Sequence, residues 1–155
     1  MRFPSVVGAM LAGGLLVVLA RQLFDRRVAL LSGLFLATSP YFVKWSQQAR
    51  VYPFLAALSI VATLLLLQAL DRGTRGAWGL YGIAYTGLLV THAVVGLLLL
   101  PAQAVLMAQR RGRVLPHGLL AGVVIVGIGV PWVAQLALRT SDEMSETAWI
   151  PRSAG

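Results

Sequence analysis

Six apolar stretches, separated by short polar or basic segments, account for most of this 155-residue chain. They cover residues 4–20, 28–43, 53–70, 77–90, 93–107 and 115–138. A helix needs roughly 20 apolar residues, within a range of about 17–25, to cross the hydrocarbon core of a bilayer. The first, third and sixth stretches meet this length alone. The second nearly does if Tyr41 and Trp45 lie in the interfacial aromatic belt.

The fourth and fifth stretches can be interpreted as one interrupted span or as two short helices. One span would contain about 30 residues, well beyond the crossing length, and Thr91 and His92 interrupt its apolar run. We therefore expect two helices that meet at these two residues. The predicted fold is all-α, a polytopic membrane protein with about six transmembrane helices. Four prolines fall near segment ends or at kink sites, which membrane helices tolerate: Pro40, Pro53, Pro101 and Pro131.

Composition supports a membrane protein and excludes several other classes. Hydrophobic residues make up 58% of the chain and charged residues only 12%, which is far from the usage of soluble domains. The net charge of +8 does not indicate a nucleic-acid-binding surface, because the basic residues form short clusters between apolar stretches. Such clusters are typical of loops at anionic lipid headgroups. The absence of cysteine excludes disulfides, a thiol nucleophile and thiolate metal ligands.

The basic residues also predict the orientation of the chain. Six spans place successive connections on alternate sides, and one side then receives eight arginines: Arg21, Arg26, Arg27, Arg72, Arg75, Arg110, Arg111 and Arg113. The other side receives five basic residues: Arg2, Lys44, Arg50, Arg139 and Arg152. The positive-inside rule places the first set in the cytoplasm. We expect a multi-pass protein of the inner or plasma membrane, with residues 1–138 as its transmembrane domain and residues 139–155 as the start of an extracytoplasmic loop.

An amino terminus on the outer side has two explanations. Arg2, the apolar run and the small residue Ala20 resemble a signal peptide with its cleavage site. Alternatively, the chain lacks an upstream helix and begins inside a longer protein. Charged Arg21 and five further spans follow directly, and the chain stops in a polar segment with no closing helix. We therefore expect a fragment.

A polar, cationic segment at residues 44–52 stands between two apolar stretches and contains the candidate site. Gln47, Gln48, Arg50 and Tyr52 offer amide, guanidinium and phenol groups at one membrane boundary, and His92 is expected at the same depth. Arg50 can bind a phosphate bidentately, which a lysine cannot do. Composition alone favours a snorkelling cation with belt aromatics and a hydrogen bond between helices. The alternative is a site for a lipid-linked phosphate that enters laterally from the bilayer.

Other chemistry has little support in the sequence. Asp25 and Asp71 stand beside arginines on the predicted cytoplasmic side, where we interpret them as solvated loop charges. The remaining acidic residues lie in the outer tail, and His92 and His117 are predicted on opposite sides of the membrane, so no zinc pair forms. A small transporter half or a membrane assembly subunit is the rival class. Transporters place charges or broken helices near the midplane, whereas the polar groups here stand at the boundaries.

The order of several motifs resembles one family over nearly the whole chain. The motifs are Arg2-Phe-Pro-Ser5, Arg21-Gln-Leu-Phe-Asp-Arg-Arg27, Ala37-Thr-Ser-Pro40, Ser46-Gln-Gln-Ala-Arg-Val-Tyr52 and Tyr85 through Thr91-His92. They are similar to the multi-spanning glycosyltransferases of the protein-O-mannosyltransferase and lipid-A-aminoarabinose-transferase type, family 39 of the GT-C class. The similarity is greatest to the bacterial branch with lipopolysaccharide-core galacturonosyltransferases. The Ser-Gln-x-Ala-Arg-x-Tyr run is the most specific piece.

This resemblance implies transfer of a sugar from a polyprenyl-phosphate donor to a lipid, glycan or protein acceptor at the outer face. Arg50, Tyr52 and their neighbours would then lie by the donor phosphate, and residues 149–151 would belong to an outer loop over the active site. The acidic pair of the family, which acts as base and sometimes as metal ligand, would precede Met1. The resemblance thus leaves a divalent metal open as a cofactor. The implied partners are the lipid-linked sugar, its acceptor and membrane lipids, with no nucleic acid.

Overall fold

The computed structural model describes residues 3–47, 51–109 and 121–129, together with positions 118, 131, 132, 134, 135 and 138. Within these residues the chain is helical and contains no strand, which confirms the all-α fold expected from the apolar pattern. Six named helices follow one another: α1 (Phe3–Leu23), α2 (Arg26–Thr38), α3 (Pro40–Gln47), α4 (Tyr52–Arg72), α5 (Arg75–Thr91) and α6 (Ala93–Gln109). Residues 121–129 are helical as well.

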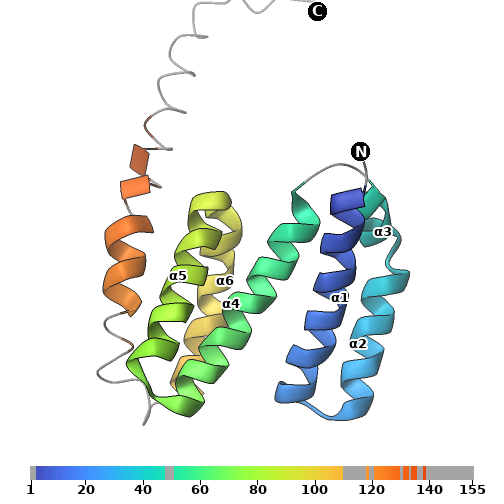
Figure 1. Cartoon of the computed structure of the whole chain (residues 1–155), viewed down its shortest axis with the longest axis horizontal. Helices are drawn as coiled ribbons and strands as arrows, with labels where there is room; N and C mark the ends of the chain where they lie inside the picture. Colours follow the sequence, from blue (N-terminus) through green and yellow to red (C-terminus); the bar gives the residue numbers. More distant parts are fainter. Residues whose placement is uncertain are drawn as a thin grey trace, which may run out of the picture.

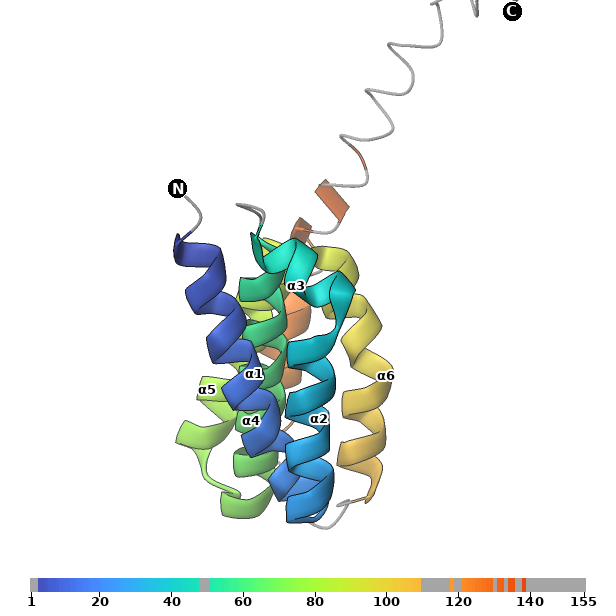
Figure 2. The same ribbon diagram turned by 90° about the vertical axis from the view of Figure 1, so that its right-hand side faces the viewer.

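The long helices run side by side, and the short α3 lies across one end of the α1–α2 pair (Figures 1 and 2). Helix α1 packs against α2 and α4, and α4 packs in turn against α5 and α6. Among the described residues, two helices are long and apolar enough to cross a membrane, Ser5–Leu23 and Tyr52–Arg72. These correspond to the first and third predicted spans. The sixth predicted span, residues 115–138, is described only in part.

Two tight turns at one end of the bundle connect α1 to α2 and α4 to α5 (Figure 1). Asp25 caps α2, because its side chain accepts a hydrogen bond from the Val28 N–H at 2.8 Å. Gly73 ends α4 with a φ of 63°, a left-handed conformation that glycine adopts without a steric penalty. Thr74 then caps α5 by accepting a hydrogen bond from the Ala77 N–H at 3.4 Å. Asp25, interpreted as a solvated loop charge, is exposed and also starts a helix.

The second predicted segment, residues 28–43, is not one continuous helix. It breaks at Ser39, whose ψ of 114° is extended, as expected for a residue that precedes proline. The Ser39 Oγ accepts a hydrogen bond from the Phe42 N–H at 3.4 Å and so caps α3. Helix α2 has 13 residues, which at about 1.5 Å per residue is too short for the roughly 30 Å hydrocarbon core.

The predicted break between the fourth and fifth stretches is confirmed. Helix α5 ends at Thr91 and α6 begins at Ala93. His92 between them has an extended backbone, and its Nδ1 accepts a hydrogen bond from the Val95 N–H at 3.4 Å. The two helices are also joined deeper in the bundle, where the Tyr85 hydroxyl donates to the Gly96 carbonyl at 2.7 Å.

The core lies between α4, α5 and α6 and is unusually aromatic. Trp78, Tyr81 and Tyr85 project from α5 and are almost fully buried against leucines of α4 such as Leu66 and Leu70. The rings of Trp78 and Tyr81 meet edge to face, with their centroids 5.9 Å apart. By contrast, most residues of α1 and α2 are not buried, since only 17% of the apolar window of α1 is buried and Ala29 is the one buried residue described in α2. The α4–α6 side is therefore the packed part of the bundle.

Candidate functional site

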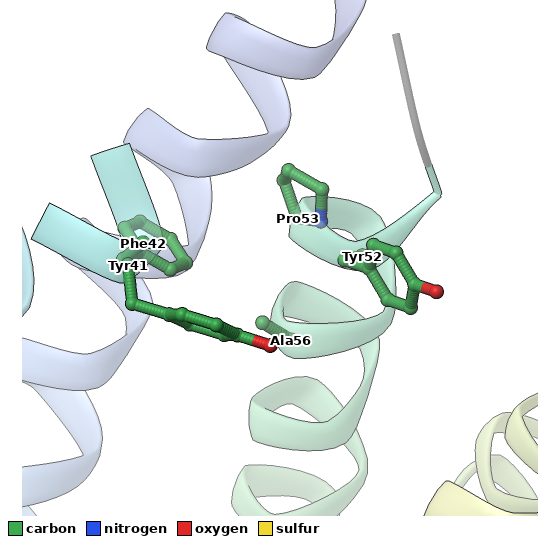
Figure 3. Close-up of a pocket in the computed structure, with 5 residues that line it drawn as sticks. All are labelled: Tyr41, Phe42, Tyr52, Pro53 and Ala56. Carbon is green, nitrogen blue, oxygen red and sulfur yellow. The ribbon is translucent and has the colours of Figure 1, made fainter. Parts of the chain in front are cut away.

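The polar segment 44–52 begins in the last turn of α3 and ends at the first residue of α4, and a cavity lies between these two helices. Its volume is about 230 Å³. Tyr41 and Phe42 of α3 and Tyr52, Pro53 and Ala56 of α4 line it. Figure 3 shows that the phenol ring of Tyr41 reaches toward Ala56, whereas the hydroxyl of Tyr52 points away from α3. The cavity therefore has aromatic and apolar walls, with phenol groups at its edge.

Local sequence explains how this cavity forms. The break at Ser39 allows α3 to leave the direction of α2 and to approach the first turn of α4. Pro53 is buried in that first turn, where its lack of an N–H leaves no helical hydrogen bond unmade. Tyr41 and Tyr52 are both exposed. Both rings are thus available at the end of the bundle that carries the polar segment.

The structure places only some of the predicted site residues at the cavity. Tyr52 lines it. Gln47 is exposed at the end of α3 and does not line it. Gln48 and Arg50 lie outside the described residues, so their positions stay predictions. Phe42 was missed by the sequence analysis, and Tyr41 was considered only as a belt aromatic, because neither residue carries a signal that distinguishes it from a lipid-facing side chain.

His92 lies at the α5–α6 junction, which is at the same end of the bundle as α3 (Figure 1). It does not line the cavity between α3 and α4. Its half-buried imidazole accepts a hydrogen bond from the Val95 N–H, so it serves as a cap for α6. The described geometry gives His92 a structural role, and its predicted contact with a phosphate stays a prediction.

The charged residue of α3 is cationic. Lys44 is exposed on α3, and no acidic side chain lines the cavity among the residues that the structure describes. In that part of the chain, no group of three or more His, Cys, Asp or Glu side chains could hold a metal ion. The described residues thus do not fit a metal cofactor. The local chemistry suits an anionic ligand with a sugar or lipid portion that packs on aromatic rings.

Comparison with known proteins gives one match. A family model described as dolichyl-phosphate-mannose-protein mannosyltransferase matches residues 1–134. No curated protein matches the chain significantly, and no solved structure does. The family match covers all six named helices and the whole of the candidate site.

Proposed function

Because the chain belongs to the dolichyl-phosphate-mannose-protein mannosyltransferase family, a family of membrane-bound glycosyltransferases, we propose that it forms part of an enzyme that uses a polyprenyl-phosphate-linked sugar. The acceptor is a lipid, glycan or protein at the outer face of the cell membrane, which the chain crosses several times. The observation that carries this proposal is the family match over residues 1–134. The motifs of segment 44–52, which lie within the matched residues, resemble the same family.

The candidate site supports this proposal through its chemistry. A sugar can pack on the exposed aromatic rings of Tyr41 and Tyr52. Arg50, two residues before Tyr52 in the sequence, supplies the bidentate group that a phosphate ester binds best. Lys44 adds a second positive charge on α3. We propose that these residues together form a donor-phosphate site at the membrane boundary.

The proposed reaction is a displacement at the anomeric carbon of the donor sugar. A bond forms from the acceptor oxygen to that carbon, while the bond from the carbon to the phosphate oxygen breaks. The polyprenyl phosphate leaves with the electron pair, and Arg50 stabilises its developing negative charge. The proton of the acceptor hydroxyl passes to a carboxylate base.

The test measures sugar transfer from a polyprenyl-phosphate donor in membranes of cells that express the natural protein. We expect Arg50→Ala to reduce turnover by about 10²-fold, as for loss of one charge-stabilising donor. Arg50→Lys should also reduce it, because lysine does not reproduce the bidentate geometry. Arg27→Ala is the matched control, because Arg27 is an exposed arginine at the opposite end of the bundle.

Unchanged turnover in both Arg50 variants would refute the assigned role of Arg50. Solute flux through vesicles that carry the protein, together with no sugar transfer by the natural protein, would refute the glycosyltransferase proposal and favour a transporter.

A further inference from the structure

A second hollow lies along α1 and α2, separate from the aromatic core of the bundle. It is a groove with a volume of about 630 Å³, bounded by apolar residues of both helices. At one end it reaches α3, where Phe42, Val43 and Ser46 complete it. Among the described residues that line it, Ser46 alone has a polar side chain. The groove is therefore a long apolar channel with one polar end.

Glycines leave part of the groove wall without side chains. Gly13 and Gly14 of α1 both line it, and a Cβ atom added to either would meet no heavy atom within 4 Å. Gly33 of α2 and Val17 of α1 also line the groove, and there the helices touch, since a Cβ atom on Gly33 would lie 2.5 Å from the Val17 Cγ2. The groove thus narrows where Val17 meets Gly33 and is open beside Gly13 and Gly14.

The groove is continuous with the candidate site, because Phe42 lines both the groove and the aromatic cavity. We propose that this groove holds the polyisoprenoid chain of the lipid-phosphate donor, with the phosphate at its α3 end. This inference rests on the proposed function and adds the path of the lipid chain. Exposed Lys44 on α3 matches the negative charge of the phosphate, and the apolar wall matches the hydrocarbon.

The physics of the bilayer limits what the groove contributes. A lipid chain gains little hydrophobic free energy when it moves from the bilayer into an apolar groove, because lipid tails are as apolar as leucine. Affinity must therefore come mainly from the phosphate contacts, while the groove supplies shape and direction. The groove aligns the donor so that its phosphate meets the polar segment, and a blocked groove weakens donor binding through misalignment.

The experiment uses the 155-residue chain in nanodiscs and a polyprenyl phosphate that carries a diazirine on its isoprenoid chain. After irradiation, mass spectrometry of the peptides identifies the labelled residues. We expect the label on the groove residues of α1 and α2, and we expect unlabelled polyprenyl phosphate to compete for it. Excess phosphatidylcholine should not compete, because it lacks the single long isoprenoid chain and the terminal phosphate monoester.

Two groove variants and one control make the test specific. Gly13→Leu and Gly14→Leu fill the groove and should abolish its labelling. Gly79→Leu on α5 is the matched control, because a Cβ atom there also meets nothing within 4 Å and Gly79 does not line the groove. Leucine favours a helix more than glycine does, so none of the three changes weakens its own helix. Labelling should be retained in the control.

The other outcomes overturn either the groove assignment or the proposed function. Equal labelling by a diazirine phosphatidylcholine, with mutual competition, would show that ordinary bilayer lipid occupies the groove. Cross-links between groove residues of two chains would identify a second copy as the occupant. If both filled variants keep the label while the natural protein transfers sugar, the groove assignment fails and the proposed function stands. If the label behaves as expected but no sugar is transferred, the proposed function fails and lipid-phosphate binding stands.

Discussion

Tyr81, Gln103 and Thr63 form a buried hydrogen-bond chain that ties α5, α6 and α4 together. The Tyr81 hydroxyl donates to the Gln103 Oε1 at 2.6 Å, and the Gln103 Nε2 donates to the Thr63 Oγ1 at 3.4 Å. Gln103 is only 1% exposed. A buried amide without partners is costly in an apolar surrounding. These hydrogen bonds therefore favour one register of the three helices.

We expect Tyr81→Phe to destabilise the protein, because it leaves the Gln103 Oε1 without its donor. The cost should lie between about 0.6 kcal/mol, the average for such bonds in membranes, and about 3 kcal/mol, the upper value for an unsatisfied buried group. Thr86→Val is the matched control on the same helix. Within the described residues the Thr86 Oγ1 is buried without a hydrogen-bond partner, so its removal should be neutral or stabilising. Unfolding of both variants in detergent measures the difference, and equal stabilities would contradict this assignment.

Of the residues that line the cavity, Tyr52 stands out in the sequence, whereas Tyr41 and Phe42 do not. Tyr52 belongs to a polar run whose composition is unusual in an apolar chain, and this made it visible. Tyr41 and Phe42 sit among apolar residues, and only the approach of α3 to α4 gives them a common cavity with Tyr52. Gly33 is a similar case. A side chain at position 33 would clash with Val17, which lies sixteen positions earlier in the sequence and contacts Gly33 across the two helices.

At the scale of helices, the length of the apolar stretches predicted the break at His92. It did not predict the break at Ser39, before Pro40. Residues 77–107 were too long for one span, and the break at His92 followed. Residues 28–43 had nearly the right length for one span, so Pro40 was interpreted as a kink or end rather than a full break. Pro101 shows why proline alone does not decide, since it lies inside α6 and the helix continues. The Ser39 side chain supplies the difference at Pro40, because it caps α3.

We expect the double change Ser39→Ala with Pro40→Ala to join α2 and α3 into one helix. The change removes the cap of α3 and the steric restriction on the residue before proline, and it restores an N–H at position 40. Amide exchange at residues 39–42 should slow, and Tyr41 should lose its position against Ala56, which reduces sugar transfer. Pro101→Ala in α6 is the control and should leave exchange in α3 unchanged. Fast exchange at residues 39–42 in the double variant would show that tertiary contacts, rather than these two residues, break the helix.

At the scale of the whole molecule, the bundle separates its two ends by chemistry. The turns between α1 and α2 and between α4 and α5 lie at one end of the bundle. Five arginines stand beside these two turns in the sequence: Arg21, Arg26, Arg27, Arg72 and Arg75. Helix α3, the start of α4 and the α5–α6 junction lie at the other end, with the aromatic cavity. The alternation of ends agrees with the order of connections that the apolar pattern predicted. A donor carried by a lipid at the outer face requires the cavity end to be outside.

The absence of cysteine from the chain makes this orientation directly measurable. Gln47→Cys places one thiol at the exposed end of α3, and Phe24→Cys places one in the exposed turn between α1 and α2. Because arginine-rich connections stay in the cytoplasm, a membrane-impermeant maleimide added to intact cells should label Gln47→Cys and not Phe24→Cys. Permeabilised cells supply the control, since both variants should then be labelled. The reverse pattern in intact cells would place the cavity in the cytoplasm, where an outer-face donor does not reach it, and the proposed site of transfer would then be wrong.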